Sequence, residues 1–210
     1  MHAFHDVEEG IGEPRPHPWA VSAHDPNAKF VDFLKCPDLV RTSLEDFIPY
    51  AHRPAVERFF QMVEWMRGPK TIWETTESCF WPPSSPHTNN FFSQYPIICS
   101  GRLVFFSRHH LWQCRHSEWA FNNLVAKLGK QQPTPPNACI GVFMFPISFR
   151  SLSTNGGQTA RECKALGVRC YGFGINEDEA FSGFGLGVDA VQEAAKGIAD
   201  MLILSGDLKP

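Results

Sequence analysis

The segment Arg108–His116 holds the densest group of side chains in this sequence that are able to do chemistry. It reads Arg-His-His-Leu-Trp-Gln-Cys-Arg-His, which places His109, His110, Cys114 and His116 close together along the chain. All nine histidines of the protein lie at or before His116. Imidazoles transfer protons near neutral pH and, together with thiolates, bind transition metals. The segment is therefore a candidate site of metal or acid–base chemistry.

The spacing within this segment predicts a metal site. In an extended chain, side chains two residues apart point to the same side. His110, Cys114 and His116 would then share one face, and His109 would lie on the other. We expect the first three to bind zinc or iron, and His109 and His110 to act as catalytic groups. Further ligands would come from a neighbouring strand or loop: Glu77, Cys79 or His87.

Other interpretations of the same segment stay open. An ordinary strand whose histidines make routine hydrogen bonds has the same alternation, and Cys-x-His alone is a weak pattern. Haem bound through His109, His110 or His116 ranks below a simple metal site, because the Cys-x-x-Cys-His attachment motif is absent. A helix expected to begin near Ser117 would also remove His116 from the shared face.

Composition limits the class of protein. The chain has 210 residues, a net charge of -3 and 43% hydrophobic residues, which is typical of a soluble globular protein. We expect a small-molecule ligand, with a protein partner as the alternative. No long basic run is present, so we expect no nucleic-acid partner. The longest apolar run, Cys139–Pro146, is too short to cross a bilayer, so we expect no membrane span.

Cysteine usage indicates a compartment. The seven cysteines are scattered and include no Cys-x-x-Cys pair, which argues against a disulfide framework. Buried free thiols in a reducing cytoplasm are the expected state.

The order of predicted elements suggests one domain. Residues 1–28 are expected to form an irregular proline-rich arm, and residues 29–210 a single globular domain. Helices are predicted over 42–48, 54–66, 117–128, 158–166 and 188–204. Strands are predicted over 71–81, 91–99, 102–112, 139–145 and 168–175, with a hairpin turn at Ser100-Gly101. The last third alternates strand and helix, which predicts a parallel pair. The fold class is α/β or α+β, with a mixed sheet of about five strands flanked by helices.

The predicted strand over 71–81 would carry part of the site. Strict alternation places Trp73, Thr75, Glu77, Cys79 and Trp81 on one face, so that Trp73, Trp81 and Trp112 could wall one pocket. Glu74 and Glu77 fall on opposite faces, which makes them poor partners for a carboxylate pair unless the strand bulges.

Two further segments have residue types that can bind a ligand. Gly183-Phe184-Gly185-Leu186-Gly187 precedes the last predicted helix and is either a phosphate cradle or a flexible lid. The spacing does not match the dinucleotide-binding motif, which favours the lid. Asn176–Glu179 is either a divalent-cation site or a solvated turn after a strand, and it does not match an EF-hand.

The expected function is that of a cytoplasmic small-molecule enzyme, with a pocket lined by histidine and cysteine and walled by aromatic residues. The alternative is a non-catalytic protein-interaction module of the immunity or adaptor type. Trp19, Trp81 and the stiff proline-rich loop over 82–86 would be its contact points.

Overall fold

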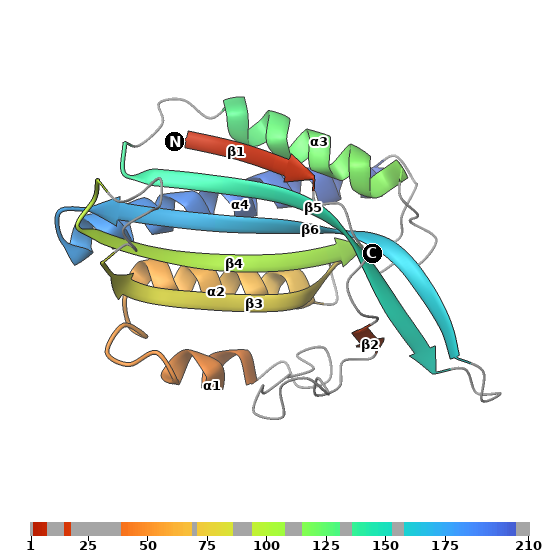
Figure 1. Ribbon diagram of the computed structural model, residues 1–210, viewed down its shortest axis with the longest axis horizontal. Helices are drawn as coiled ribbons and strands as arrows, with labels where there is room; N and C mark the ends of the chain where they lie inside the picture. Colours follow the sequence, from red (N-terminus) through yellow and green to blue (C-terminus); the bar gives the residue numbers. More distant parts are fainter. Residues whose placement is uncertain are drawn as a thin grey trace.

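The computed structural model describes residues 2–7, 15–17, 39–68, 71–85, 94–107, 115–130, 136–152 and 158–204. Within these ranges the chain forms one mixed sheet with helices beside it (Figure 1). The strands are β1 His2–Val7, β2 Arg15–His17, β3 Trp73–Ser84, β4 Ile97–Ser107, β5 Ala138–Leu152 and β6 Gln158–Gly174. The helices are α1 Leu39–Glu45, α2 Pro54–Arg67, α3 Arg115–Lys130 and α4 Glu177–Leu204.

The sheet confirms the expected α+β class. Its strand order is β1-β5-β6-β4-β3, and β2 also pairs with β5. Neighbours from β5 to β3 are antiparallel, whereas β1 and β2 run parallel to β5. The parallel pair predicted for 139–145 and 168–175 is wrong, because these segments belong to β5 and β6 and form an antiparallel hairpin.

The prediction of a helix over 158–166 is also wrong. This error explains why a parallel pair of strands was predicted. Residues 158–166 form the first half of β6, which pairs without a register shift from Gln158 opposite Leu152 to Gly172 opposite Ala138. Long-range strand pairing has overridden the local helical pattern. Without a crossover helix, β6 can only return antiparallel to β5.

The N-terminal region contributes backbone to the sheet. An irregular arm was expected over 1–28, but β1 pairs with residues 139–144 of β5 and β2 with residues 149–151. The remaining residues of that region lie outside the described ranges.

Helices α2 and α4 pack behind the sheet in the view of Figure 1, and they make the core with its rear face. The predicted helix over 54–66 is confirmed, with Pro54 in its first turn and Gly68 at its C-terminal cap. Phe59 of α2 and Phe184 of α4 lie 5.8 Å apart, centroid to centroid. The helix predicted over 42–48 begins earlier, at Leu39, so Thr42 lies inside α1 and does not cap it.

The hairpin predicted at Ser100-Gly101 does not exist, because β4 runs straight through both residues. A Cβ atom on Gly101 would lie 2.8 Å from the Phe59 ring and 3.0 Å from the Phe184 ring. The glycine therefore lets two large rings approach the strand rather than turning it. The expectation of a central strand buried on both faces is confirmed, since Leu103, Val104, Phe105 and Phe106 are all buried.

Helix α4 approaches the sheet very closely. Cβ atoms on Gly172 and Gly183 would each lie 1.9 Å from a backbone oxygen, of Ala180 and of Asn137 respectively. These glycines lie where the backbones of strand, turn and helix come together. The sequence 183–187 is inside α4, which begins at Glu177 and not at Val188. It is neither a phosphate cradle nor a lid with glycine hinges.

Strand β3 bulges in its middle. Thr75 pairs with Phe105 and Glu77 with Val104, so one extra residue lies between them on β3. The alternation of faces is reversed beyond this point. The prediction that Trp73 and Trp81 share a face is therefore wrong. After Trp81 the strand continues through Pro82 and Pro83 to Ser84, so the expected proline-rich loop begins as the end of an edge strand.

Candidate functional site

The predicted metal and catalytic residues are only partly placed. His109, His110 and Cys114 lie outside the described residues, as does Trp112. Strand β4 ends at Ser107, and α3 begins at Arg115, so His116 lies in the first turn of a helix. Strand alternation therefore does not place His116 on a common face with the others. The metal site itself stays a prediction.

Among the described residues, no group of three or more His, Cys, Asp or Glu side chains could hold a metal ion. Of the further ligands considered, Cys79 is half-buried on β3, and His87 lies outside the described ranges. The register places residues 74 and 77 opposite Phe106 and Val104, two apart on β4, so the bulge brings them to the same side of the sheet backbone.

Three described cysteines are poor nucleophiles. Burial raises the pKa of the Cys99 thiol to about 12 and that of Cys139 to about 11, and it also raises the pKa of Cys170. The reactive form of cysteine is the thiolate, which these thiols do not form near neutral pH. Buried free thiols were expected, and these three confirm that expectation.

The two placed tryptophans of the expected pocket do not lie together. Trp73 is 2% exposed and donates from its indole nitrogen to the Ala195 oxygen of α4, at 3.3 Å. It belongs to the core behind the sheet. Trp81 is 42% exposed and pairs with Ser100 in the register of β3 and β4. It lies on the other side, which we call the front face because it is turned toward the viewer in Figure 1.

The front face carries a cluster that the sequence analysis missed. Trp81, Ser100 and Tyr171 form one row across β3, β4 and β6, and Arg169 lies two residues before Tyr171 on β6. The guanidinium carbon of Arg169 is 4.9 Å from the Trp81 ring centroid and 5.8 Å from that of Tyr171. Because Ser100 is small, the guanidinium has room to reach across it. We call these four residues the front-face cluster.

The hydrogen bonding of Arg169 is incomplete. Its Nη1 donates to the Tyr171 hydroxyl at 3.3 Å, and its buried Nε has no hydrogen-bond partner. In the part of the chain that the structure describes, Arg169 makes no ion pair with a carboxylate. Its residue partner in the register of β4 is Arg102. The cluster is therefore a half-buried positive site.

A small buried cluster of aromatic and aliphatic residues lies next to the front-face cluster, on β6 and at the start of β4. Tyr95 and Phe173 stack with their centroids 4.1 Å apart, and Ile98 and Tyr171 pack beside them. Phe173 is buried, so this group is a small core cluster, and Tyr171 belongs both to it and to the front-face cluster.

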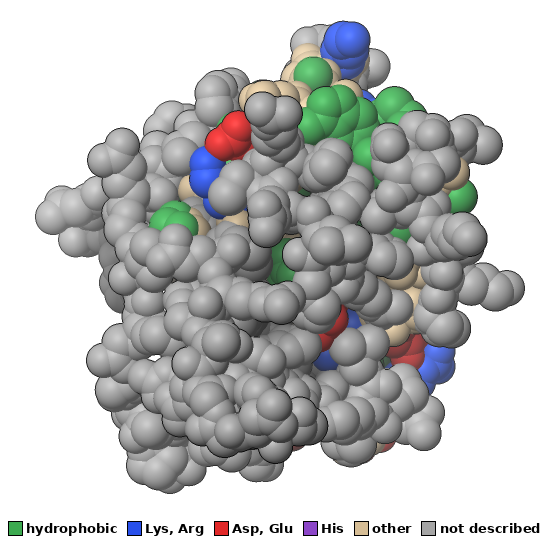
Figure 2. Space-filling model, turned by 90° about the vertical axis from the view of Figure 1, so that its right-hand side faces the viewer, with side chains coloured by type: hydrophobic (Ala, Val, Ile, Leu, Met, Phe, Trp, Pro, Cys, Tyr) green, Lys and Arg blue, Asp and Glu red, His purple; other side chains and the backbone are tan. Residues whose placement is uncertain are grey.

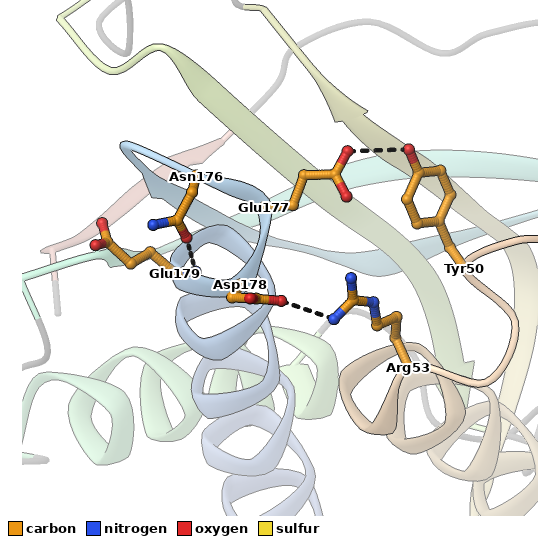
Figure 3. A network of polar contacts seen from close by, with 6 residues as sticks. All are labelled: Tyr50, Arg53, Asn176, Glu177, Asp178 and Glu179. Atoms are coloured by element: carbon orange, nitrogen blue, oxygen red, sulfur yellow. Dashed lines mark hydrogen bonds and ion pairs between the residues drawn. The ribbon is translucent and has the colours of Figure 1, made fainter.

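The acidic sequence Asn176–Glu179 forms the start of α4 (Figure 3). The Asn176 side-chain oxygen accepts a hydrogen bond from the Glu179 amide at 2.9 Å, while Glu179 accepts one from the Ile175 amide at 3.0 Å. Together these bonds cap the helix. The arrangement agrees with a structural turn and gives no sign of a divalent-cation site among the described residues.

The other two acidic residues of this turn join α4 to the turn before α2 (Figure 3). Glu177 accepts a hydrogen bond from the Tyr50 hydroxyl at 3.1 Å, which raises the pKa of Tyr50. Asp178 pairs with Arg53 at 2.7 Å. The carboxylates of Glu177 and Asp178 therefore already have partners within the protein.

Acidic and basic side chains also lie close together in other parts of the described structure. Figure 2 shows described acidic and basic side chains lying beside one another on the end of the molecule at the right of Figure 1. Arg58 pairs with Asp189 at 2.6 Å, and Lys164 pairs with Glu118. Such neutralised pairs contrast with Arg169, whose charge has no carboxylate beside it among the described residues.

Part of the front-face cluster had a sequence signal. Within the strand predicted over 168–175, alternation alone places Arg169 and Tyr171 on one face. Nothing local indicates that Trp81 lies nearby, because that depends on β4 being inserted between β3 and β6.

Comparisons with protein-family models, curated proteins and solved structures found no match. Within the described residues, none of the helices has the length and apolar character needed to cross a membrane.

Proposed function

We propose that this protein is a non-catalytic interaction module that binds a partner protein through the front face of its sheet. The observation that carries the proposal is Trp81, a large aromatic side chain 42% exposed and in contact with Arg169. Tryptophan, tyrosine and arginine are the residue types most enriched among the dominant contacts of protein interfaces. All three meet in the front-face cluster.

The chemistry of the described residues supports binding over catalysis. The buried thiols have raised pKa values, and the carboxylates at the start of α4 are occupied by capping and by contacts with α2's preceding turn. By contrast, the front-face cluster has an exposed aromatic surface and a cation without a carboxylate. These features suit recognition of another molecule.

A pull-down from native-host lysate with matched variants tests this proposal. Trp81→Ala removes the exposed ring, and Trp119→Ala removes a comparably exposed ring, 36%, on α3. We expect the unaltered protein to capture a partner reproducibly. Trp119→Ala should still capture it, and Trp81→Ala should not. A partner retained equally by both variants would contradict the proposal.

A metal-dependent small-molecule enzyme is the second candidate. It rests on His109, His110 and Cys114 lying in the seven-residue connection between Ser107 of β4 and Arg115 of α3, next to His116. Zinc or iron would be the metal, with haem as a lesser alternative. The buried free thiols support a reducing, cytoplasmic location for either function.

Elemental analysis and an absorption spectrum of the purified protein test this second candidate. A bound metal that is lost in Cys114→Ala but kept in Cys79→Ala would support it. A colourless, metal-free protein whose thermal stability does not respond to added zinc, iron or haem would count against it.

A further inference from the structure

We propose that Arg169 is the receptor for a carboxylate group, supplied by an acidic segment of the partner. This inference rests on the proposed function and specifies its chemistry. It begins from the observation that Arg169 is half-buried yet has no carboxylate beside it among the described residues. Removing a charge from water is costly unless an opposite charge compensates. An incoming carboxylate would supply that compensation.

The contacts with Trp81 and Tyr171 determine which N–H groups of the Arg169 guanidinium can reach a ligand. Rings that lie over a guanidinium cover its faces and leave the N–H groups at its edge. Nη1 of Arg169 is occupied by the Tyr171 hydroxyl, and Nε is buried. Nη2 makes no hydrogen bond within the described part of the chain, so its N–H groups are donors that remain for a ligand.

The surroundings favour an anion over a neutral ligand. Among the described residues no carboxylate lies beside the Arg169 guanidinium, so an anion bound there would supply the missing opposite charge. Trp81 and Tyr171 exclude water from the guanidinium, which strengthens a charge-assisted hydrogen bond.

A carboxylate fits this site better than a phosphate group or a nucleic acid. Phosphate recognition and nucleic-acid binding use clusters of several arginines or lysines. The site has one guanidinium without a carboxylate among the described residues, in a protein of net charge -3. The ring of Trp81, on the edge strand, would contact the apolar part of the acidic side chain.

Isothermal titration calorimetry of the full-length protein tests the proposal, with hexaglutamate as the probe. We expect hexaglutamate to bind, hexaglutamine not to bind, and affinity to fall at high salt. Arg169→Met should weaken hexaglutamate binding about tenfold to a hundredfold, since hydrogen bonds to charged groups are worth about 1.5–3 kcal/mol. Arg169→Lys keeps the charge but loses the planar shape, so it should bind more weakly than the natural protein.

Arg53→Met is the matched control. Arg53 also contacts a ring, 5.2 Å from the Phe181 centroid, but it already pairs with Asp178. We expect its hexaglutamate affinity to match that of the unaltered protein. Equal weakening by Arg53→Met and Arg169→Met would overturn the proposal, as would tighter binding of a phosphoserine peptide or of oligo-dT than of hexaglutamate.

The two proposals fail separately. If partner capture depends on Trp81 but hexaglutamate does not bind, the carboxylate receptor is wrong while the interaction face stands. If hexaglutamate binding depends on Arg169 but partner capture ignores Trp81, the receptor stands and the proposed partner face is wrong. Circular dichroism of each variant shows that lost binding is not lost folding, and Arg169→Lys remains informative if Arg169→Met does not fold.

Discussion

The guanidinium of Arg67, in the last turn of α2, binds Thr75 where β3 bulges. Its Nη2 donates to the Thr75 main-chain oxygen at 2.8 Å, and its Nε donates to the Thr75 hydroxyl. Both residues are buried, at 8% and 0% exposure. A bulge disrupts the ladder of backbone hydrogen bonds, and Arg67 supplies a donor at that place. The contact thus joins the end of a helix to the irregularity that reverses the faces of β3.

Arg67→Met is expected to destabilise the protein by about 1–3 kcal/mol, because it leaves a buried main-chain oxygen without its side-chain donor. Urea unfolding measured by circular dichroism gives the change in free energy. Arg41→Met is the control: Arg41 is 78% exposed in its ion pair with Glu64, and exposed pairs contribute about 0–1 kcal/mol. Similar losses in the two variants would show that Arg67 does not support the bulge.

Two glycine-to-alanine substitutions are expected to change the free energy of unfolding in opposite directions. A Cβ on Gly183 would lie 1.9 Å from the Asn137 oxygen, so Gly183→Ala should destabilise the protein by about 1–3 kcal/mol or more. Gly129 has no atom within 4 Å of that position, so Gly129→Ala should stabilise α3 by up to about 1 kcal/mol. Thermal unfolding distinguishes them. A stabilising Gly183→Ala would mean that α4 is farther from the sheet.

The buried thiols predict a pH dependence of stability. In the folded protein the pKa of Cys99 is raised from 9.0 to about 12, so above pH 9 the unfolded chain releases a proton that the folded chain keeps. Stability from this thiol is complete below pH 9 and falls as the pH rises toward 12. Between pH 8 and pH 10 the free energy of unfolding should fall in both proteins, and the fall should be about 1 kcal/mol smaller in Cys99→Ala than in the unaltered protein. Urea midpoints at the two pH values measure this, and parallel declines would contradict it.

Capping of α4 gives a further prediction. Asn176→Ala removes the acceptor for the Glu179 amide and should lower the free energy of unfolding by about 0.5–2 kcal/mol. Asn123→Ala is the comparison, because the Asn123 side chain is in the middle of α3 and donates only to the Trp119 oxygen at 2.9 Å. It should cost less than Asn176→Ala. Denaturant titration of both variants makes the comparison.

Elements with strong local signals could be predicted from the sequence. Helix α2 has Pro54 at its start, Gly68 at its end and apolar residues at helical spacing between them, and the structure agrees. Strand β6 could not be predicted in full, because residues 158–166 have a helical pattern and become a strand only by pairing with β5. The bulge at Thr75 has no glycine or proline to indicate it, and its support comes from Arg67 on another element.

The candidate site depended even more on non-local structure. In residues 108–116, chemically capable side chains are neighbours along the chain, and this is the kind of signal that a sequence shows directly. The front-face cluster instead draws on β3, β4 and β6, which are joined by long connections. Trp81 was identified as an exposed aromatic, but its contact with Arg169 follows from the strand order and from the bulge, which turns Trp81 away from the core.

The two prolines at the end of β3 affect how this molecule meets its neighbours. Within the described residues β3 pairs only with β4, which leaves its outer backbone edge available to extended chains. Pro82 and Pro83 have no amide hydrogens, so the ladder of another copy cannot continue past Trp81. The edge is thereby protected against growth into fibrils or stacked aggregates at high concentration. A chain that adds to this edge would therefore lose backbone hydrogen bonds at Pro82 and Pro83, next to Trp81.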